Sequence, residues 1–171
     1  MQVQIMRAAI ATVLMAISTS AIASNDKLYS VNPGAFIFHA YEPKTDYTQY
    51  FDNQYIAVER KLNAQSDYSL SVGTLVNSFS NRCMLLGVRK DWWEKGHWTF
   101  KGGYAYAGEF FFSQFSHCGD EGIYRNIKDA VGIGFAPYIY HALQYDFNDH
   151  FGLEGGVILP GIVVLSMQFH F

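Results

Sequence analysis

The last nine residues, Val163 to Phe171, read VVLSMQFHF and decide the fold class. Every second side chain is apolar as far as the terminal Phe, and three of the four residues between them are polar. This period of two predicts a β-strand with one apolar face. A soluble sandwich could contain such a strand. A chain that stops on Phe in strand register is, however, typical of outer-membrane barrels of Gram-negative bacteria.

The amino-terminal residues indicate export. An apolar run from Ala8 to Ile17 follows a basic residue, and the small residues after it end in Ala21-Ile22-Ala23. This is the pattern of a secretory signal peptide, and the run is too short to span a bilayer. We therefore predict a signal peptide over 1–23 and a mature domain over 24–171 that reaches an oxidising compartment.

The composition fits one folded domain. The chain has 171 residues, of which 50% are hydrophobic, 17% aromatic and 16% charged, with a formal net charge of −3. The aromatic content excludes a disordered chain. The sequence has no cluster of Lys and Arg, so we exclude nucleic acid as a partner.

Alternation of apolar and polar residues elsewhere in the chain predicts seven further strands. The total of eight is the number of strands in the smallest common membrane barrels. The eight strands are expected at 34–42, 52–61, 67–77, 82–92, 97–110, 129–146, 151–159 and 162–171. Residues 24–33 are expected to form only a short lead-in. Tight turns alternate with long polar links at 43–51 and 111–128, which would put both chain ends in the periplasm.

The polar side chains at every second position of the predicted strands, here called the polar alternates, distinguish a membrane barrel from a soluble barrel of lipocalin type. They are small or charged, and they are Ser69, Ser71, Arg89, Asp91, Lys101 and Glu154. Their apolar counterparts are Leu70, Val72, Leu86, Val88, Phe100, Tyr104, Tyr106, Leu153 and Val157. A polar interior with an apolar exterior is what lipid requires. The sequence therefore predicts an all-β fold, an eight-stranded antiparallel transmembrane β-barrel of the outer membrane.

Motifs for common catalytic chemistry do not occur in the sequence. We find no metal-ligand spacing and no G-x-S-x-G, Walker or dinucleotide-binding pattern, so neither metal nor cofactor is expected. His39 falls on the alternate set that faces the lumen, near the outer end of its strand. Asn77 and Ser78 end another strand at the same level. An imidazole near a hydroxyl can serve as a base, or it can be a buried polar group with a structural partner.

Four segments carry a family resemblance. They are AFIFHA at 35–40, GTLVNSF at 73–79, ILPG at 158–161 and MQFHF at 167–171. In order and strand position they resemble the lipid A palmitoyltransferase family. Its members are eight-stranded outer-membrane barrels that transfer a palmitoyl chain from a phospholipid to lipid A. The resemblance implies these two lipids as partners and no cofactor.

The resemblance also implies site residues. In the family, a His at the outer end of the first strand and an Asp-Ser pair after the third are required for activity. They match His39, Asn77 and Ser78, so an Asn replaces the Asp. An amide cannot act as a base, and we expect Asn77→Asp to keep or raise activity. Prolines beside the sixth strand remove ladder donors and admit lipid sideways in the family, and Pro137 and Pro160 resemble them. The alternatives are a bulge at Pro137 and a loop edge at Pro160.

The resemblance thus implies acyl transfer from a phospholipid to lipid A or a similar outer-leaflet acceptor by a monomeric barrel. His39 would deprotonate the acceptor hydroxyl or polarise the ester. Ser78 would donate to the oxyanion or relay a proton, and Asn77 would orient or donate. The deep glycine that sets acyl length in the family falls in or near 86–89. The alternative is a small non-enzymatic outer-membrane barrel, a structural, adhesion or surface-interaction protein, with 111–128 as its working loop.

The two cysteines are expected to meet. Cys83 opens the strand at 82–92, and Cys118 follows the strand at 97–110, so both lie at the outward end of neighbouring strands. Exported cysteines so placed would oxidise, and the bridge would tether the long loop over the lumen mouth. The alternative is that one cysteine lies deeper in the wall and both stay reduced.

Overall fold

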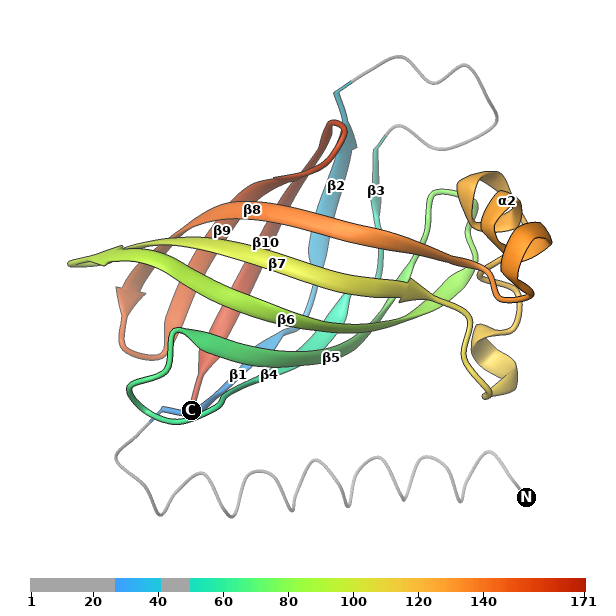
Figure 1. Ribbon diagram of the computed structural model, residues 1–171. Coiled ribbons are helices and arrows are strands. Elements are labelled where there is room, and N and C mark those ends of the chain that lie inside the picture. Colours follow the sequence, from blue (N-terminus) through green and yellow to red (C-terminus); the bar gives the residue numbers. More distant parts are fainter. Residues whose placement is uncertain (1–26, 41–49) are drawn as a thin grey trace, which may run out of the picture.

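A computed structural model describes residues 27–40 and 50–171, with only the backbone at 50–52 (Figure 1). The expected signal peptide and most of the first long link lie outside the described residues. The elements in chain order are β1 (Tyr29–Asn32), β2 (Ala35–His39), β3 (Tyr50–Asp52), β4 (Ile56–Lys61), β5 (Tyr68–Val76), β6 (Arg82–Lys95), β7 (Trp98–Gly108), η1 (Ser113–Phe115), α2 (Gly122–Val131), β8 (Phe135–Asn148), β9 (Phe151–Ile158) and β10 (Ile162–His170).

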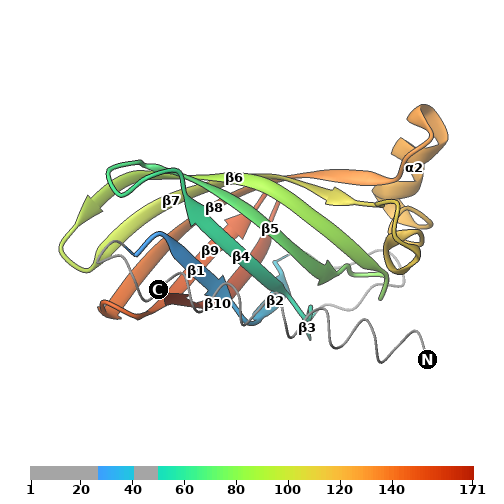
Figure 2. The same cartoon turned by 90° about the horizontal axis from the view of Figure 1, so that it is seen from below.

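The strands form one antiparallel sheet that closes on itself (Figures 1 and 2). β1 and β2 are two halves of one wall strand, because both pair with β10. β3 and β4 are two halves of the next, because β3 pairs with β2 and β4 pairs with β1. The ten segments therefore build a wall of eight strands, and the predicted fold class is confirmed.

The first wall strand begins earlier than predicted. Tyr29–Asn32 form β1, which pairs with both β4 and β10, so the expectation of a mere lead-in is wrong for these residues. The inward-facing residues Ser30 and Asn32 are polar and buried. Pro33 then interrupts the ladder, since it has no N–H to donate. Because its buried positions are polar and Pro33 follows it, this strand does not show the apolar alternation by which the other strands are predicted.

The sixth wall strand begins later than the predicted range 129–146. Residues 122–131 form α2 instead, and β8 starts at Phe135. Ile123 and Ile127 repeat with helical spacing, and Gly132 ends the helix with φ of 84° and an N–H bond of 2.8 Å to the Lys128 carbonyl. The long link after β7 is therefore partly folded, with η1 and α2 in it.

Side-chain burial confirms the predicted inside-out pattern. Of the polar alternates, Ser69, Ser71, Arg89, Lys101 and Glu154 are buried in the lumen. On the outer face the exposed apolar side chains include Leu70, Val72, Val88, Phe100, Tyr104, Leu153 and Val157. The barrel therefore has the polar interior and the apolar exterior of a barrel in lipid.

The two ends of the barrel differ. At the short-turn end, tight turns join β4 to β5, β6 to β7 and β8 to β9, and the exposed Trp92, Trp93 and Trp98 surround the second of these. At the loop end lies the long connection from β7 to β8, with η1 and α2 in it (Figure 1). Within the described residues no helix is long and apolar enough to cross a membrane.

Candidate functional site

His39 lies at the loop end of β2 with its side chain directed into the lumen. Its backbone pairs with Ile162 of β10, and only 2% of the residue is exposed. Ile37 and Ala35, two and four residues earlier, are buried on the same face, whereas Phe36 is exposed on the other. The period of two that predicted an inward imidazole is therefore confirmed.

Ser78 comes from the turn that follows β5. The Ser80 N–H donates to the Asn77 carbonyl over 3.0 Å, and Ser80 has a positive φ of 65°, so the chain reverses here. This turn places the Ser78 Oγ 3.1 Å from the His39 Nε2. Which of the two groups donates depends on the imidazole tautomer. The distance is that of a nucleophile or hydroxyl donor paired with a base.

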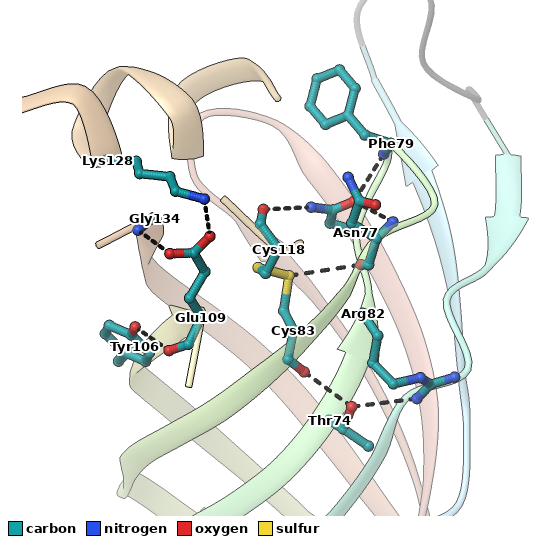
Figure 3. The surroundings of a disulfide bond; sticks show 11 residues. Thr74, Asn77, Phe79, Arg82, Cys83, Tyr106, Glu109, Cys118, Lys128 and Gly134 are labelled. Carbon is teal, nitrogen blue, oxygen red and sulfur yellow. Dashed lines mark hydrogen bonds and ion pairs between the residues drawn. A yellow bond between two sulfur atoms is a disulfide. The ribbon is translucent and has the colours of Figure 1, made fainter. Parts of the chain in front are cut away.

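Asn77 does not share this contact but holds the turn in place (Figure 3). Its Oδ1 accepts the N–H groups of Phe79 and Asn81, each over 3.0 Å. Its Nδ2 donates to the Cys118 carbonyl over 3.3 Å. The side chain is buried, so these three bonds replace the water it would otherwise bind. Asn77 is therefore a positioning residue for Ser78.

Two further links join this turn to the loop after β7. Cys83 and Cys118 form a disulfide with a Cα separation of 5.0 Å (Figure 3). Phe79 packs against Gly122, where a Cβ would come within 2.5 Å of its ring, and Gly122 also has a positive φ of 59°. A side chain is excluded there for both reasons. The turn that carries Ser78 is therefore tied to the long loop.

Charged groups brace the same loop. The Lys128 Nζ lies 2.5 Å from the Glu109 Oε1 and 2.9 Å from the Asp120 Oδ1. The Lys128 ammonium, together with the His117 imidazole, holds the pKa of the Asp120 carboxyl below its usual range. The two carboxylates raise the pKa of Lys128 in turn. These groups are partly exposed, so their contribution to stability is modest.

A cavity of about 70 Å³ lies in the lumen, deeper in the barrel than the His39–Ser78 contact. Ile37 and Leu75 line it, and each lies two residues before His39 or Asn77 on the same strand face. Most of its wall is apolar: Ala35, Ile37, Leu75, Leu85, Gly87, Ala105, Ile158 and Val164. The site thus combines an imidazole and a hydroxyl with an apolar recess beneath them.

Buried charges close the floor of this cavity. The Arg89 Nη1 lies 2.6 Å from the Glu59 Oε1, and its Nη2 binds Glu154. Gln168 and Asn32 donate to the Glu59 carboxylate over 2.9 and 3.0 Å. A second cavity of about 360 Å³, lined mostly by polar groups, opens beyond this cluster at the short-turn end. The charge cluster therefore separates an apolar upper lumen from a polar lower one.

The wall is incomplete beside β8. The β8–β9 ladder ends at Tyr140 and Ile158, followed by one bond from the Leu159 N–H to the Ile139 carbonyl. Residues 135–138 of β8 pair only with β7. Alternate residues of a strand direct their backbone groups to the same side, so Pro137 and Ile139 both face β9. Pro137 has no N–H and therefore cannot donate a hydrogen bond to β9. Pro160 lies in the turn between β9 and β10, after a cis peptide bond.

The site could be predicted in part. Alternation alone placed His39 in the lumen, whereas the turn conformation that brings Ser78 to it left no sequence signal. Glu59, which completes the cavity floor with Arg89 and Glu154, was missed. Its position in the strand predicted at 52–61 was the available signal, but its pairing depends on the register of three strands.

Comparison with known proteins bears on the fold. A solved structure described as "De novo design of transmembrane beta-barrels" has a TM-score of 0.51 and 10% sequence identity, covering 86% of this chain and 98% of that chain. No model of a known family and no curated protein matches the sequence. At this identity the likeness shows the fold alone. The chain is an eight-stranded antiparallel barrel similar in structure to a designed transmembrane β-barrel.

Proposed function

We propose that this chain is an outer-membrane acyltransferase that moves an acyl chain from a phospholipid to lipid A or a similar outer-leaflet acceptor. This is the reaction of the family that its sequence resembles. The observation that carries the proposal is the 3.1 Å contact between the His39 Nε2 and the Ser78 Oγ above an apolar recess in the lumen. A buried base beside a hydroxyl donor suits ester chemistry.

The cavity would hold the distal part of the acyl chain. Its volume of about 70 Å³ accommodates only a short length of acyl chain. A longer chain requires lining side chains to move. The buried charges of Arg89 and its partners stop the chain at the floor, since methylenes that reached them would displace polar contacts. The unpaired edge of β8 at Pro137 is the proposed route of entry from the bilayer.

The chemistry can be written with the groups present. The acceptor hydroxyl gives its proton to the His39 Nε2, and its oxygen attacks the ester carbonyl of the donor phospholipid. The Ser78 hydroxyl turns from the imidazole to the developing oxyanion and donates to it. Collapse of the tetrahedral intermediate breaks the bond to the glycerol oxygen, which takes the proton from His39. The products are the acylated acceptor and a lysophospholipid.

The same contact would also suit an acyl-Ser78 intermediate, with His39 as the base. We favour direct transfer, and the two routes differ in a measurable way. Mass spectrometry of the intact protein after mixing with the phospholipid donor alone would show an added acyl mass only in the covalent route. Ser78→Ala would remove that mass, whereas direct transfer leaves the protein mass unchanged throughout.

Mass spectrometry of lipid A from expressing cells tests the proposal. We expect one additional acyl chain with the wild type and none with His39→Ala or Ser78→Ala. His117→Ala and Ser116→Ala are matched controls, since both residues lie exposed in the loop after β7 and should leave the new chain in place. A lipid A profile that the wild type does not change would favour the non-enzymatic surface barrel.

A further inference from the structure

We propose that α2 and the phenylalanines at 110–112 form a lipid-binding surface that lies in the outer interface of the bilayer. The bound class is the phospholipid or glycolipid of the outer leaflet, contacted where head groups meet acyl chains. This proposal depends on membrane residence of the barrel and is independent of acyl transfer.

α2 is seated on the barrel by one side only. Tyr124 is buried, with 6% exposed, in a cluster that includes the Cys83–Cys118 disulfide and Ala136 of β8. Lys128, one turn further, binds Glu109 and Asp120. The helix is therefore fixed through its Tyr124 and Lys128 side, and its two flanks are free to meet the surroundings.

The flanks of α2 have opposite character. On one flank Ile123 and Val131 are 58% and 63% exposed, and Ile127 lies between them, four residues from each. On the other flank Arg125 and Asp129 are exposed. An exposed helix with one apolar and one charged flank is the form that lies flat in a membrane interface. Apolar side chains that gather into one exposed patch mark an interaction surface.

The phenylalanines extend the same surface. Phe111 is 79% exposed, and its ring centroid lies 4.2 Å from that of Phe110 and 4.4 Å from that of Phe112. They follow β7 directly, and η1 beyond them contacts β6, while α2 packs on β8. Figure 2 shows α2 projecting past the wall formed by these strands. The apolar groups of the loop therefore gather on one sector of the loop end.

This surface continues the outer face of the barrel. Ile139 and the partly exposed Phe135 belong to the outward side of β8, and the exposed Ile133 links them to the end of α2. Tyr106 of β7 stacks on Phe135 with ring centroids 5.2 Å apart. The apolar band that faces lipid thus runs without a polar break onto the helix.

The separation from the tryptophans at the short-turn end fits one bilayer. β7, which runs from Trp98 to the residues just before the phenylalanines, has 11 residues and so spans about 36 Å along its axis. With the usual strand tilt of about 40°, this becomes about 28 Å along the membrane normal, close to the apolar band of about 25 Å in such barrels. Aromatic side chains therefore mark both edges of the band, as at two membrane interfaces.

Depth-dependent fluorescence quenching tests the proposal. The three native tryptophans are replaced by Phe, and single tryptophans are introduced as Ile123→Trp on the apolar flank or Arg125→Trp on the charged flank. Val131→Trp provides a second apolar probe in case the first fails to fold. Each protein is refolded into phosphatidylcholine vesicles whose acyl chains carry bromine near the head-group end or carry none, and folding is verified by the heat-dependent gel shift.

We expect bromine to reduce the emission of Ile123→Trp and Val131→Trp at least about twofold more than that of Arg125→Trp. An aqueous quencher should show the reverse order. Equal quenching of all three by the aqueous agent would overturn the proposal. So would protection of the apolar probes from both quenchers with cross-linked dimers, which would mean that a second copy covers the helix. The wild type reports insertion independently, because its native tryptophans are quenched only if the barrel enters the bilayer.

Discussion

The structure and the family resemblance predict different effects of Asn77→Asp on activity. The resemblance implies that an acid at this position keeps or raises activity. In the structure, however, the Asn77 Nδ2 donates to the Cys118 carbonyl over 3.3 Å, and a carboxylate has no hydrogen to donate there. We therefore now predict that Asn77→Asp lowers activity, because it loosens the turn that carries Ser78.

The magnitude follows from the three bonds of this side chain. Aspartate retains the two acceptor contacts to the N–H groups of Phe79 and Asn81, which a charge strengthens. It loses the bond to Cys118 and places a carboxylate oxygen against a carbonyl oxygen in a buried site. The balance is a local cost of about 1–2 kcal/mol, which corresponds to a five- to thirtyfold fall in the equilibrium constant between the turn that holds Ser78 at His39 and its open forms.

The initial rate of acyl transfer by the refolded protein measures this effect. Asn77→Ala, which loses all three bonds, should be slower still, so the rates should rank wild type, Asp, Ala. Asn63→Asp is a matched control, since Asn63 caps an exposed turn at the short-turn end by accepting the Gln65 N–H over 3.0 Å. A rate for Asn77→Asp equal to or above the wild type would refute the positioning role and restore the expectation from the resemblance.

Three other perturbations have defined outcomes. Replacing Cys83 and Cys118 by Ser should lower the free energy of unfolding by roughly 3–4 kcal/mol, because the bridge closes a separation of 35 residues; an unchanged urea midpoint would exclude this tether. Arg89→Met should cost about 3–5 kcal/mol in the same assay, since it leaves Glu59 and Glu154 buried without their cation, and a smaller loss would show that these carboxylates protonate or hydrate. Deleting the last three residues should block assembly, seen as loss of the folded band in a heat-shift gel, whereas normal assembly would remove the inference from the terminal Phe.

The fold was predictable where one face of a strand is continuously apolar. The terminal strand shows this best, because Val163, Leu165 and Met167 are all exposed on the outer face. β1 escaped because its buried positions are Ser30 and Asn32, which resemble a polar linker when no partner strands are known. Burial of such residues is favourable only through bonds that closure of the barrel provides, as when Gln168 donates to the Ser30 hydroxyl over 2.9 Å.

The site was predictable only as far as strand alternation reaches. That rule directs His39 inward, but it does not apply to the turn with Ser78 or to the loop with Cys118. Their positions follow from local geometry, such as the positive φ of Ser80, and from contacts between loops that are 41 residues apart at Asn77 and Cys118. At α2 the sequence predicts loop and strand, because a helix of 10 residues has fewer than three turns in which to show an apolar repeat.

The most direct test of the proposed acyl transfer uses defined components. The refolded barrel is mixed in detergent with one phospholipid of known acyl chains and with lipid A, and both products are quantified by mass spectrometry. We predict that acylated lipid A and lysophospholipid appear in equal amounts with the wild type and with His117→Ala, and that neither appears with His39→Ala. Formation of both products at the wild-type rate by folded His39→Ala, or their absence with the folded wild type, would contradict the proposal.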